Sequence, residues 1–364
     1  MFEAKKRNRK SGLRTAFIFG RERFEPERRK MKKKIIAVFV TLILAGALFA
    51  ACSPGNSGGG EVQAPPHAPE QESAQEAQDE TGITVTDMMG REVRLSAPAT
   101  RVVALTAADV EILFAIGAGD ALVGRGEYCN YPPEALDIQS VESGYETNIE
   151  QVIDLEPQLL IMSKMAQNVD QMQQFEGAGI AVFVTDAQDI EGVYEAISLI
   201  GELMGKETEA EALVQEMKDV FAGLQDKAKA SGGDQKSIYF EVSPLEFGLW
   251  TAGSDTFMNE VAELLGLKNI FDDISGWAEV SEEQVLERNP DMIMTVGMYF
   301  GDGPTPIESI LSRPGWENIT AVKDNAIINL TADELSRPGP RLALGAKLLY
   351  EFVFEGGSAT PDGA

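Results

Sequence analysis

A short sequence that occurs twice constrains the fold of this chain more than any other feature. It reads EQVIDLEPQLLIM from Glu150 to Met162 and EQVLERNPDMIMT from Glu283 to Thr295. Each copy follows a helix-capping residue, Asn148 or Ser281, with a Gln three positions later, and this spacing is the capping box that begins a helix. A proline ends each helix, and the apolar run after it predicts a buried strand. A unit of helix, proline and strand is therefore expected once in each half of the chain.

A second pair of segments repeats more weakly. EILFAIGAGDAL begins at Glu111 and EVAELLGLKNIF at Glu260, and in each a helical pattern runs into a glycine, Gly117 or Gly266. The two halves therefore predict two related α/β lobes, and the alternation of strand and helix patterns favours a mainly parallel sheet. A cleft between two lobes is where a binding protein holds its ligand.

Residues 1–51 predict a secretory signal. The apolar, uncharged run Ile35–Ala51 follows three lysines and precedes Cys52, which is typical of a signal peptide and too short and one-sided for a membrane span. The residues LFAAC resemble a bacterial lipobox, whose cysteine is lipidated and becomes the new N-terminus, so lipidation is predicted at Cys52. A plain signal peptide with an incidental cysteine is the alternative. A start at Met31 fits this signal well, since the residues before it are basic and lie awkwardly upstream.

Residues 52–81 are rich in Gly, Pro, Ser, Gln and Glu and have little to bury, so they are predicted to form a disordered tether. Removing residues 1–51 removes 14 of the 31 Lys and Arg but only 4 of the 58 Asp and Glu, which moves the formal net charge from −27 to −37. Nucleic acid is then excluded as a partner, because phosphate binding needs a basic patch. A charge of this size favours solubility and cationic partners.

The part of the chain from residue 82 shows the pattern of a folded protein. Residues 82–205 predict an N-terminal α/β lobe that opens with a hairpin, and residues 232–355 predict a second α/β lobe. Between them, apolar residues in 206–231 recur at three- and four-residue steps, which predicts one long amphipathic helix. Such a helix spans about 37 Å, enough to connect two lobes. Residues 356–364 are expected to be a disordered tail. The predicted fold is two Rossmann-like α/β lobes joined by a single long helix.

Several segments together resemble the substrate-binding lipoproteins of ABC importers for cobalamin, haem and ferric siderophores, with the cobalamin members closest. The segments are GRGEYCNYPPEA, NIEQVIDLEPQLLI, LWTAGSDTFMNEVAELLGLKNIF, GWAEVSEEQVLERNPDMIM and TADELSRPGPRLALGAKLL, in this order over about residues 82–355. The resemblance implies lobes bridged by one rigid helix with small hinge motion. It also implies a monomer that delivers its ligand to a permease dimer with a cytoplasmic ATPase, at the outer face of the bacterial cytoplasmic membrane.

The same resemblance implies particular ligand-binding residues. In the cobalamin branch a tyrosine of an xYxxYP loop and a tryptophan of a Wxx[VI]Sxx[QE] stretch lie against the ligand, and the matching residues are Tyr128 and Trp277. Asp333 and Arg337, carried over likewise, would line the cleft from the second lobe. Arg341 could bind a ligand carboxylate or phosphate beside Arg337, or serve a structural role at the start of a helix.

Physical chemistry supports aromatic residues as ligand contacts. Large aromatic side chains grip a planar macrocycle with apolar area at low entropic cost. Further aromatic residues fall in predicted loops near strand ends, where ligands bind in open α/β sheets: Tyr131, Tyr145, Trp250 and Tyr299. For Tyr131 and Trp250 a packing role is an equally good interpretation.

Glu150 and Glu283 occupy the same place in the two copies of the repeat. Each is predicted at the second position of its helix, where the helix dipole stabilises a carboxylate by about 0.3–1 kcal/mol, which alone would explain a Glu there. The resemblance implies a further role, in which both glutamates project from the lobe tips and dock onto arginines of the permease, one per subunit.

The chemistry that the chain lacks narrows its function. Its one histidine, His67, lies in the tether, which excludes a zinc or manganese site built on imidazoles and a histidine-ligated haem. Tyr128 or Met298 could still ligate haem iron. Cys129 could be a ligand or reactive thiol, or simply a small buried residue. No intrachain disulfide framework is expected, because Cys52 is the other cysteine.

No nucleophile elbow, P-loop or catalytic carboxylate pair stands in a convincing context, so the chain is predicted not to be an enzyme and to have no resident cofactor or metal. The expected function is a lipid-anchored solute-binding protein for a corrinoid. The alternatives are a haem or ferric-siderophore binder of the same transporter class and, from another class, a surface adhesin or sensor.

Overall fold

The computed structural model of the protein describes residues 82–232, 235–243, 245–297, 303–330 and 334–356. The predicted signal, Cys52, the tether and residues 357–364 of the predicted tail lie outside these residues, and so do Met298, Tyr299 and Asp333. Over the described part of the chain, no helix has both the length and the apolar character needed to cross a bilayer.

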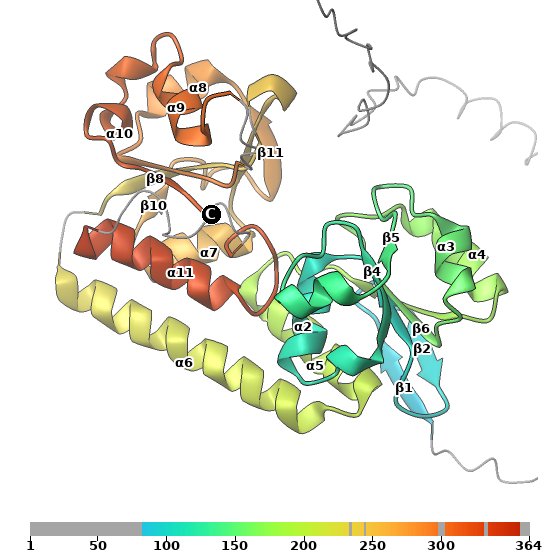
Figure 1. Cartoon of the computed structure of the whole chain (residues 1–364). Helices are drawn as coiled ribbons and strands as arrows, with labels where there is room; N and C mark the ends of the chain where they lie inside the picture. The colour runs from blue at the N-terminus through green and yellow to red at the C-terminus, as the bar shows by residue number, and fades with distance from the viewer. Residues whose placement is uncertain (1–81, 233–234, 244, 298–302, 331–333, 357–364) are drawn as a thin grey trace, which may run out of the picture. The chain divides into compact units, whose positions relative to one another are not determined.

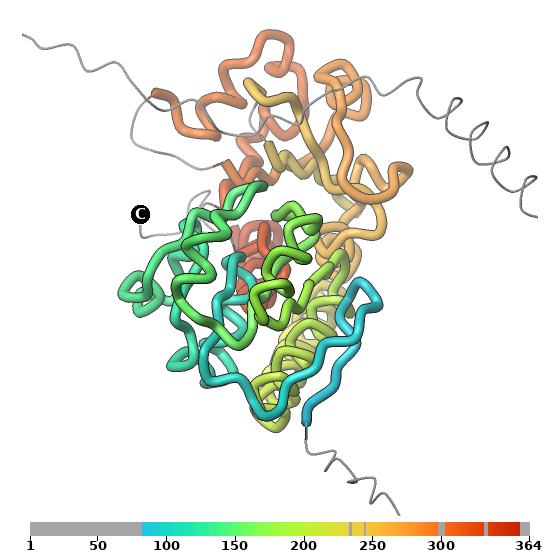
Figure 2. Tube along the Cα trace, turned by 90° about the vertical axis from the view of Figure 1, so that its right-hand side faces the viewer, coloured from blue at the N-terminus to red at the C-terminus, as the bar shows by residue number. Residues whose placement is uncertain are grey.

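The N-terminal lobe is built on a parallel sheet of five strands in the order β5-β4-β3-β6-β7. Its strands are β3 (Val102–Ala104), β4 (Leu122–Gly126), β5 (Ser140–Val141), β6 (Leu159–Ser163) and β7 (Ala181–Thr185). The predicted hairpin precedes it as antiparallel β1 (Ile83–Thr86) and β2 (Glu92–Leu95). The hairpin packs against the β7 edge of the sheet and against α5 (Ile190–Met204) (Figure 2).

The other helices of this lobe begin with side-chain caps or follow tight turns. They are α2 (Ala107–Ala115), α3 (Ile149–Asp154) and α4 (Met172–Gly177), with short 3-10 turns η1 (Gly119–Ala121), η2 (Pro133–Asp137) and η3 (Val169–Gln171). Thr106 caps α2 and Asp189 caps α5, each accepting a hydrogen bond from a first-turn amide.

The C-terminal lobe has a parallel sheet of four strands in the order β10-β8-β12-β13. These strands are β8 (Ser237–Glu241), β10 (Lys268–Asn269), β12 (Met292–Thr295) and β13 (Ile327–Asn329). A separate antiparallel pair joins β9 (Leu249–Ala252) to β11 (Trp277–Val280). The helices and turns are η4 (Leu245–Phe247), α7 (Phe257–Leu264), α8 (Glu282–Arg288), α9 (Pro306–Leu311), η5 (Trp316–Asn318), α10 (Thr320–Lys323), α11 (Leu342–Tyr350) and the π-helical turn η6 (Glu351–Glu355).

One long helix, α6 (Glu207–Ser231), connects the lobes, as the amphipathic pattern predicts. It packs against α5, α7 and α11 (Figure 1). Its buried side includes Met217, Phe221 and Leu224. Together with the two parallel sheets, this helix confirms the predicted fold of two α/β lobes with a helical connection.

The repeated sequence forms the same elements in both lobes, α3 with β6 and α8 with β12. The capping box is complete only in the second copy, where the Gln284 side chain accepts from the Ser281 amide at 2.9 Å. In the first copy Gln151 Oε1 accepts from the Glu142 amide at 2.9 Å instead, so the prediction of a full box at Asn148 is wrong. The Asn148 amide is not available to Gln151, because it donates to the Glu142 carbonyl at 2.9 Å.

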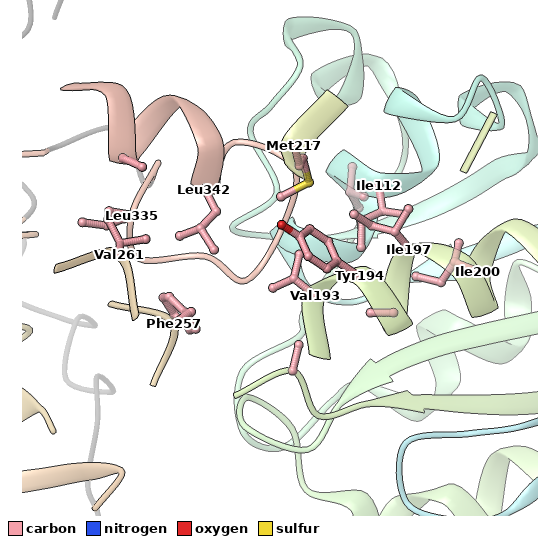
Figure 3. Close-up of a cluster of buried hydrophobic side chains, with 14 of the residues drawn as sticks. Ile112, Val193, Tyr194, Ile197, Ile200, Met217, Phe257, Val261, Leu335 and Leu342 are labelled. Atoms are coloured by element: carbon pink, nitrogen blue, oxygen red, sulfur yellow. The ribbon is translucent and has the colours of Figure 1, made fainter. Parts of the chain in front are cut away.

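The apolar core continues from one lobe into the other. A single cluster of buried side chains includes Ile112 of α2, Tyr194 of α5, Met217 of α6, Phe257 of α7 and Leu342 of α11 (Figure 3). Polar contacts accompany it, since the Phe257 amide donates to the Gln188 carbonyl at 2.8 Å and the Ile190 amide to Glu260 Oε2 at 2.7 Å. Two smaller clusters stay within single lobes. The helices α2, α5, α6, α7 and α11 thus meet in an apolar joint shared by both lobes.

Candidate functional site

Exposed apolar side chains gather in the loops that follow the carboxyl ends of the parallel strands. Tyr128 follows β4 with 66% of its surface exposed, and Tyr145 follows β5 with 69% exposed. Met165 follows β6 and Phe247 follows β8, and both are exposed. Ligands of open α/β sheets bind outside the carboxyl ends of the strands, and large exposed apolar residues are typical of binding surfaces. We call these loops the strand-end surface.

The loop of residues 127–132, named the aromatic loop, is held firmly by its own lobe. At Gly126 a Cβ would lie 2.1 Å from the Leu105 carbonyl oxygen, so only glycine lets the end of β4 approach β3 this closely. Buried Arg125 donates from Nε to the Ala135 carbonyl at 2.7 Å, and the Glu127 amide donates to Ser143 Oγ at 3.1 Å. The loop backbone is therefore fixed while the Tyr128 ring points into solvent.

Both tryptophans of the predicted site lie in strands, and the prediction that they lie in loops is wrong. Trp250 belongs to β9 and Trp277 begins β11, with Glu279 opposite Trp250 and Ala252 opposite Trp277 in the ladder. Each strand has only four residues, too few for alternation to show in the sequence. Aromatic residues nevertheless favour such half-buried pleated surfaces.

Trp277 reaches from the C-terminal lobe to the N-terminal lobe. Its ring packs on Phe257 with the centroids 5.3 Å apart, and its Nε1 donates to Gln188 Oε1 at 3.2 Å. The side chain is half-buried, as is that of Trp250. One edge of the indole is thus already engaged by the N-terminal lobe.

The predicted ligand contact Arg337 also binds groups of the N-terminal lobe. Its Nη1 donates to Glu111 Oε1 at 3.0 Å and to Asn130 Oδ1 at 3.1 Å. Arg341 donates to both oxygens of Glu111, and its guanidinium lies 4.1 Å from the centroid of the Tyr131 ring. The contacts of Arg341 therefore agree with a structural role. One face of the Tyr131 ring packs against the Arg341 guanidinium.

The two repeated glutamates are exposed at the second positions of α3 and α8. Hydrogen bonds from its own backbone amide and from the Ser281 hydroxyl lower the pKa of Glu283, so this carboxylate is charged at neutral pH. The helix that carries it is anchored beneath, where Trp316 Nε1 donates to Glu282 Oε2 at 2.9 Å.

Cys129 is a small buried residue, which is one of the roles that its sequence context allowed. Its side chain is fully buried, and burial, followed by the charge of Asp109, raises the pKa of the thiol to about 12. A thiol with such a pKa stays protonated at neutral pH and is neither a nucleophile nor a ready metal ligand. Among the residues with described positions, no group of three or more His, Cys, Asp and Glu side chains could hold a metal ion.

Two of the surface cavities in the described part of the chain have linings that include neither Tyr128 nor Trp277. One, of about 400 Å³, lies in the C-terminal lobe between Lys236, Asp291 and Phe352. The other, of about 420 Å³, lies beside the hairpin; it is lined by Gln188 and by the carboxylates Asp87, Asp186, Asp189, Glu191 and Glu195.

Sequence reasoning missed several residues of this region. Met165 and Phe247 join the strand-end surface, and their places in the segments that follow predicted strands could have identified them. Glu111 and Gln188, which bind Arg337 and Trp277, gave no such signal, because their partners are more than 80 positions away along the chain.

Comparison with known proteins agrees with this architecture. Residues 102–334 match the periplasmic binding protein family. The chain belongs to that family, whose members are extracytoplasmic binding proteins, so it is a binding protein and not an enzyme.

Particular relatives are similar over most of their length. The chain is 33% identical over 326 residues to the uncharacterized ABC transporter substrate-binding lipoprotein YvrC of Bacillus subtilis (strain 168), covering 88% of this chain and 98% of that protein. It is 31% identical over 255 residues to the vitamin B12-binding protein of Salmonella paratyphi A, covering 69% and 89%. A solved structure of a possible iron-binding (periplasmic solute-binding) protein from Staphylococcus epidermidis has 30% identity and a TM-score of 0.61, covering 71% of this chain and 100% of that one.

Proposed function

We propose that the chain is a lipid-anchored extracytoplasmic solute-binding protein that captures a cobalamin-like corrinoid between its lobes and delivers it to an ABC importer. The observation that supports this most is the strand-end surface, where both lobes present exposed aromatic and apolar side chains. The similarity to an ABC transporter substrate-binding lipoprotein and to a vitamin B12-binding protein supports the transporter class and the ligand.

The strand-end surface suits a large planar ligand. Tyr128, Tyr131 and Tyr145 would contact it from the N-terminal lobe, and Trp250 and Trp277 from the C-terminal lobe. Aromatic rings add about 0.5–1.5 kcal/mol per well-placed contact beyond the area they bury. Met165 and Phe247 would extend the apolar contact. The exposed part of Arg337 would meet a polar substituent, and Tyr299 and Asp333 stay proposed contacts outside the described residues.

A haem or ferric-siderophore ligand is the second candidate within the same transporter class. It is favoured by the similarity to a possible iron-binding protein, and a phenol as exposed as that of Tyr128 could ligate ferric iron. A surface adhesin or sensor, the candidate from another class, would use the same lobes without such a ligand.

Membrane attachment and docking complete the proposal. Lipidated Cys52 would hold the protein at the outer face of the cytoplasmic membrane, and Glu150 with Glu283 would contact a permease dimer that works with a cytoplasmic ATPase. The protein would act as a monomer.

Cys52→Ser should release the protein from the membrane fraction or stall its processing. Mass spectrometry that finds an unmodified N-terminus at another residue would contradict the anchor.

A co-elution experiment tests the ligand. Purified protein from residue 52 onward is incubated with cyanocobalamin, haem and several ferric siderophores, and absorbance is recorded after gel filtration. Retained corrin absorbance that is lost in Tyr128→Ala supports the corrinoid. Leu344→Ala removes an exposed apolar side chain of α11, outside the loops that form the strand-end surface, and should retain the ligand. Retained haem or siderophore absorbance selects the second candidate, and a protein that retains none of them argues for the adhesin or sensor.

A further inference from the structure

A buried carboxylate of the N-terminal lobe binds two arginines that follow the last strand of the C-terminal lobe. The Glu111 side chain of α2 is 2% exposed. Its Oε1 accepts from Arg337 Nη1 at 3.0 Å and from Arg341 Nη2 at 2.7 Å, while its Oε2 accepts from Arg341 Nε at 2.9 Å. The arginine side chains are 15% and 12% exposed. We call these three residues the Glu111 clasp.

The backbone that carries the arginines packs directly on α2. A Cβ added at Gly339 would lie 3.4 Å from the Cα of Ala108 in the first turn of that helix. Leu335 and Leu342, on either side of the arginines, are fully buried in the apolar joint that also contains Ile112 of α2 (Figure 3). The clasp is therefore a fixed part of the contact between the lobes.

Each arginine of the clasp also touches the aromatic loop. Arg337 donates to the side chain of Asn130, and Arg341 stacks on the ring of Tyr131. These two loop residues lie two and three positions after Tyr128, whose exposed ring is the proposed ligand contact. Glu111 thus orients both guanidinium groups, and these contact the loop in addition to Arg125 of its own lobe.

The chemistry of the clasp makes it rigid. A pair of parallel hydrogen bonds from a guanidinium to a carboxylate is strong and fixes the orientation of both groups. Burial reduces the screening of this ion pair by salt. Removal of one partner from such a buried pair leaves an uncompensated charge and is strongly destabilising. A cationic guanidinium stacked on a tyrosine ring adds a further restraint.

We propose that Glu111 is a positioning residue of the ligand site, which acts through Arg337 and Arg341 to hold the aromatic loop, and with it Tyr128, in register with the C-terminal lobe. The effect on ligand affinity rests on the proposed function, whereas the effect on the loop does not. Loss of a purely structural ion pair would not alter the aromatic loop in particular. Loss of Glu111 should loosen that loop, and this difference separates the two roles.

The chain offers a matched control in a second buried ion pair. Arg313 donates to both oxygens of Glu241 at 2.6 and 2.8 Å, and both side chains are almost fully buried. This pair lies within the C-terminal lobe, where Arg313 stacks on Trp316 and not on the aromatic loop. Glu241→Gln therefore reproduces the loss of a buried carboxylate without touching the clasp.

Hydrogen–deuterium exchange on the mature protein without ligand is the first test. In Glu111→Gln, amides of residues 127–131 should exchange at least about tenfold faster than in the wild type, because the loop loses one of its two supports. Glu241→Gln should leave these amides unchanged. An unchanged loop in Glu111→Gln, or an equal acceleration in both variants, overturns the proposal.

A milder variant decides the case if Glu111→Gln does not fold. Arg341→Lys keeps the positive charge but loses the two-pronged bond and the flat stack on Tyr131. It should accelerate exchange in the aromatic loop by severalfold while the amides of β6 and β12 keep their protection. An aromatic loop as protected as in the wild type contradicts the clasp.

Titration with cyanocobalamin, or with the probe that co-elutes, is the second test. If Glu111 acts through the loop, Arg341→Lys and Tyr128→Ala should each weaken binding, and the double variant should weaken it by clearly less than the product of the two factors. Fully multiplicative effects overturn the positioning role. A wild type that binds none of the probes refutes the proposed function instead, and the exchange experiment still decides the clasp.

Discussion

At the scale of single residues, the first turns of α2 carry two buried carboxyl groups that are accommodated in different ways. Glu111 is bound by two guanidinium groups. Asp109 is held by the hydroxyl of Thr106, the N-cap of the helix. Burial raises the pKa of Asp109 from 3.8 to about 7, and hydrogen bonds from Thr106 and Thr185 only partly oppose this. One helix therefore holds a group that titrates near neutral pH beside an ion pair.

Asp109 should make the protein less stable as the pH rises toward neutrality. Between about pH 4 and pH 7 the unfolded chain has lost this proton while the folded chain keeps it, so the folded state binds more protons and the free energy of unfolding falls. At about 1.4 kcal/mol per pKa unit the effect amounts to a few kcal/mol at most. Urea denaturation of Asp109→Asn and wild type across this range should show the advantage of the wild type shrinking with pH.

The exposed residue Asp120 of the same lobe provides the control for this prediction. Asp120→Asn removes a carboxylate without changing a buried site. A difference between wild type and Asp109→Asn that stays constant from about pH 4 to pH 8 would show that Asp109 is charged throughout.

The proposed ligand contacts Tyr128 and Trp277 differ in how much they contribute to the stability of the fold. Tyr128→Ala removes an exposed ring and should weaken ligand binding by about 1–3 kcal/mol without loss of stability. Trp277→Phe keeps the packing on Phe257 but loses the bond to Gln188, so it should cost some stability as well as affinity. Titration calorimetry combined with thermal denaturation separates the two effects. Unchanged affinity in both variants would remove these residues from the site.

At the scale of elements, α3 and α8 share a sequence pattern but not the same support. Helix α8 begins with a complete capping box and is tied below through Glu282 to Trp316. Helix α3 has the cap of Asn148, while Gln151 holds the preceding loop instead. The helices that carry the proposed docking residues Glu150 and Glu283 are therefore supported by different contacts.

Removal of the α8 cap should test this support directly. Ser281→Ala deletes the acceptor for the Gln284 amide and should lower the free energy of unfolding by about 0.5–2 kcal/mol in urea denaturation. Ser281→Asn keeps an acceptor at the N-cap and should retain most of the stability. No loss of stability in Ser281→Ala would show that the cap contributes little beyond the packing of Val285.

Elements with strong local signals were predictable from the sequence. The helices α3, α6 and α8 and the strands β6 and β12 lie where capping residues, prolines and apolar spacing predict them. The strands β9 and β11 were not predictable, because four residues are too few to show a period. The capping box at Asn148 was predicted wrongly for another reason, since the Asn148 amide donates to the Glu142 carbonyl and Gln151 accepts from the Glu142 amide instead.

The candidate site was predictable only in part. Exposed Tyr128 and Tyr145 lie at strand ends as expected, since a loop after a strand is a local feature. The partners of Arg337 and Trp277 were not predictable, because Glu111 and Gln188 meet them only when the two lobes fold together. Such contacts depend on the whole topology and leave no pattern in a single sequence.

At the scale of the whole molecule, the acidic surface and the paired glutamates support docking to a cationic partner. Glu150→Ala combined with Glu283→Ala should leave ligand affinity unchanged and reduce uptake sharply, because the strand-end surface is intact while docking loses both charges. Transport assays in cells and ligand titration on the purified variant measure the two quantities. The control is Glu317→Ala, which removes one exposed charge elsewhere on the C-terminal lobe. Undiminished uptake in the double variant would leave the helix dipole as the reason for the repeated glutamates.

The apolar joint has a consequence for how this protein can be divided. A cut in the gene before α6 looks natural, because the repeated sequence places one copy on each side of it. Each fragment would then expose its share of the buried joint, from Ile112 and Tyr194 on one side to Phe257 and Leu342 on the other. Neither half would behave as an independent domain, and both would tend to aggregate. The two copies of the repeat therefore mark a duplication in sequence within what is a single cooperative unit of folding.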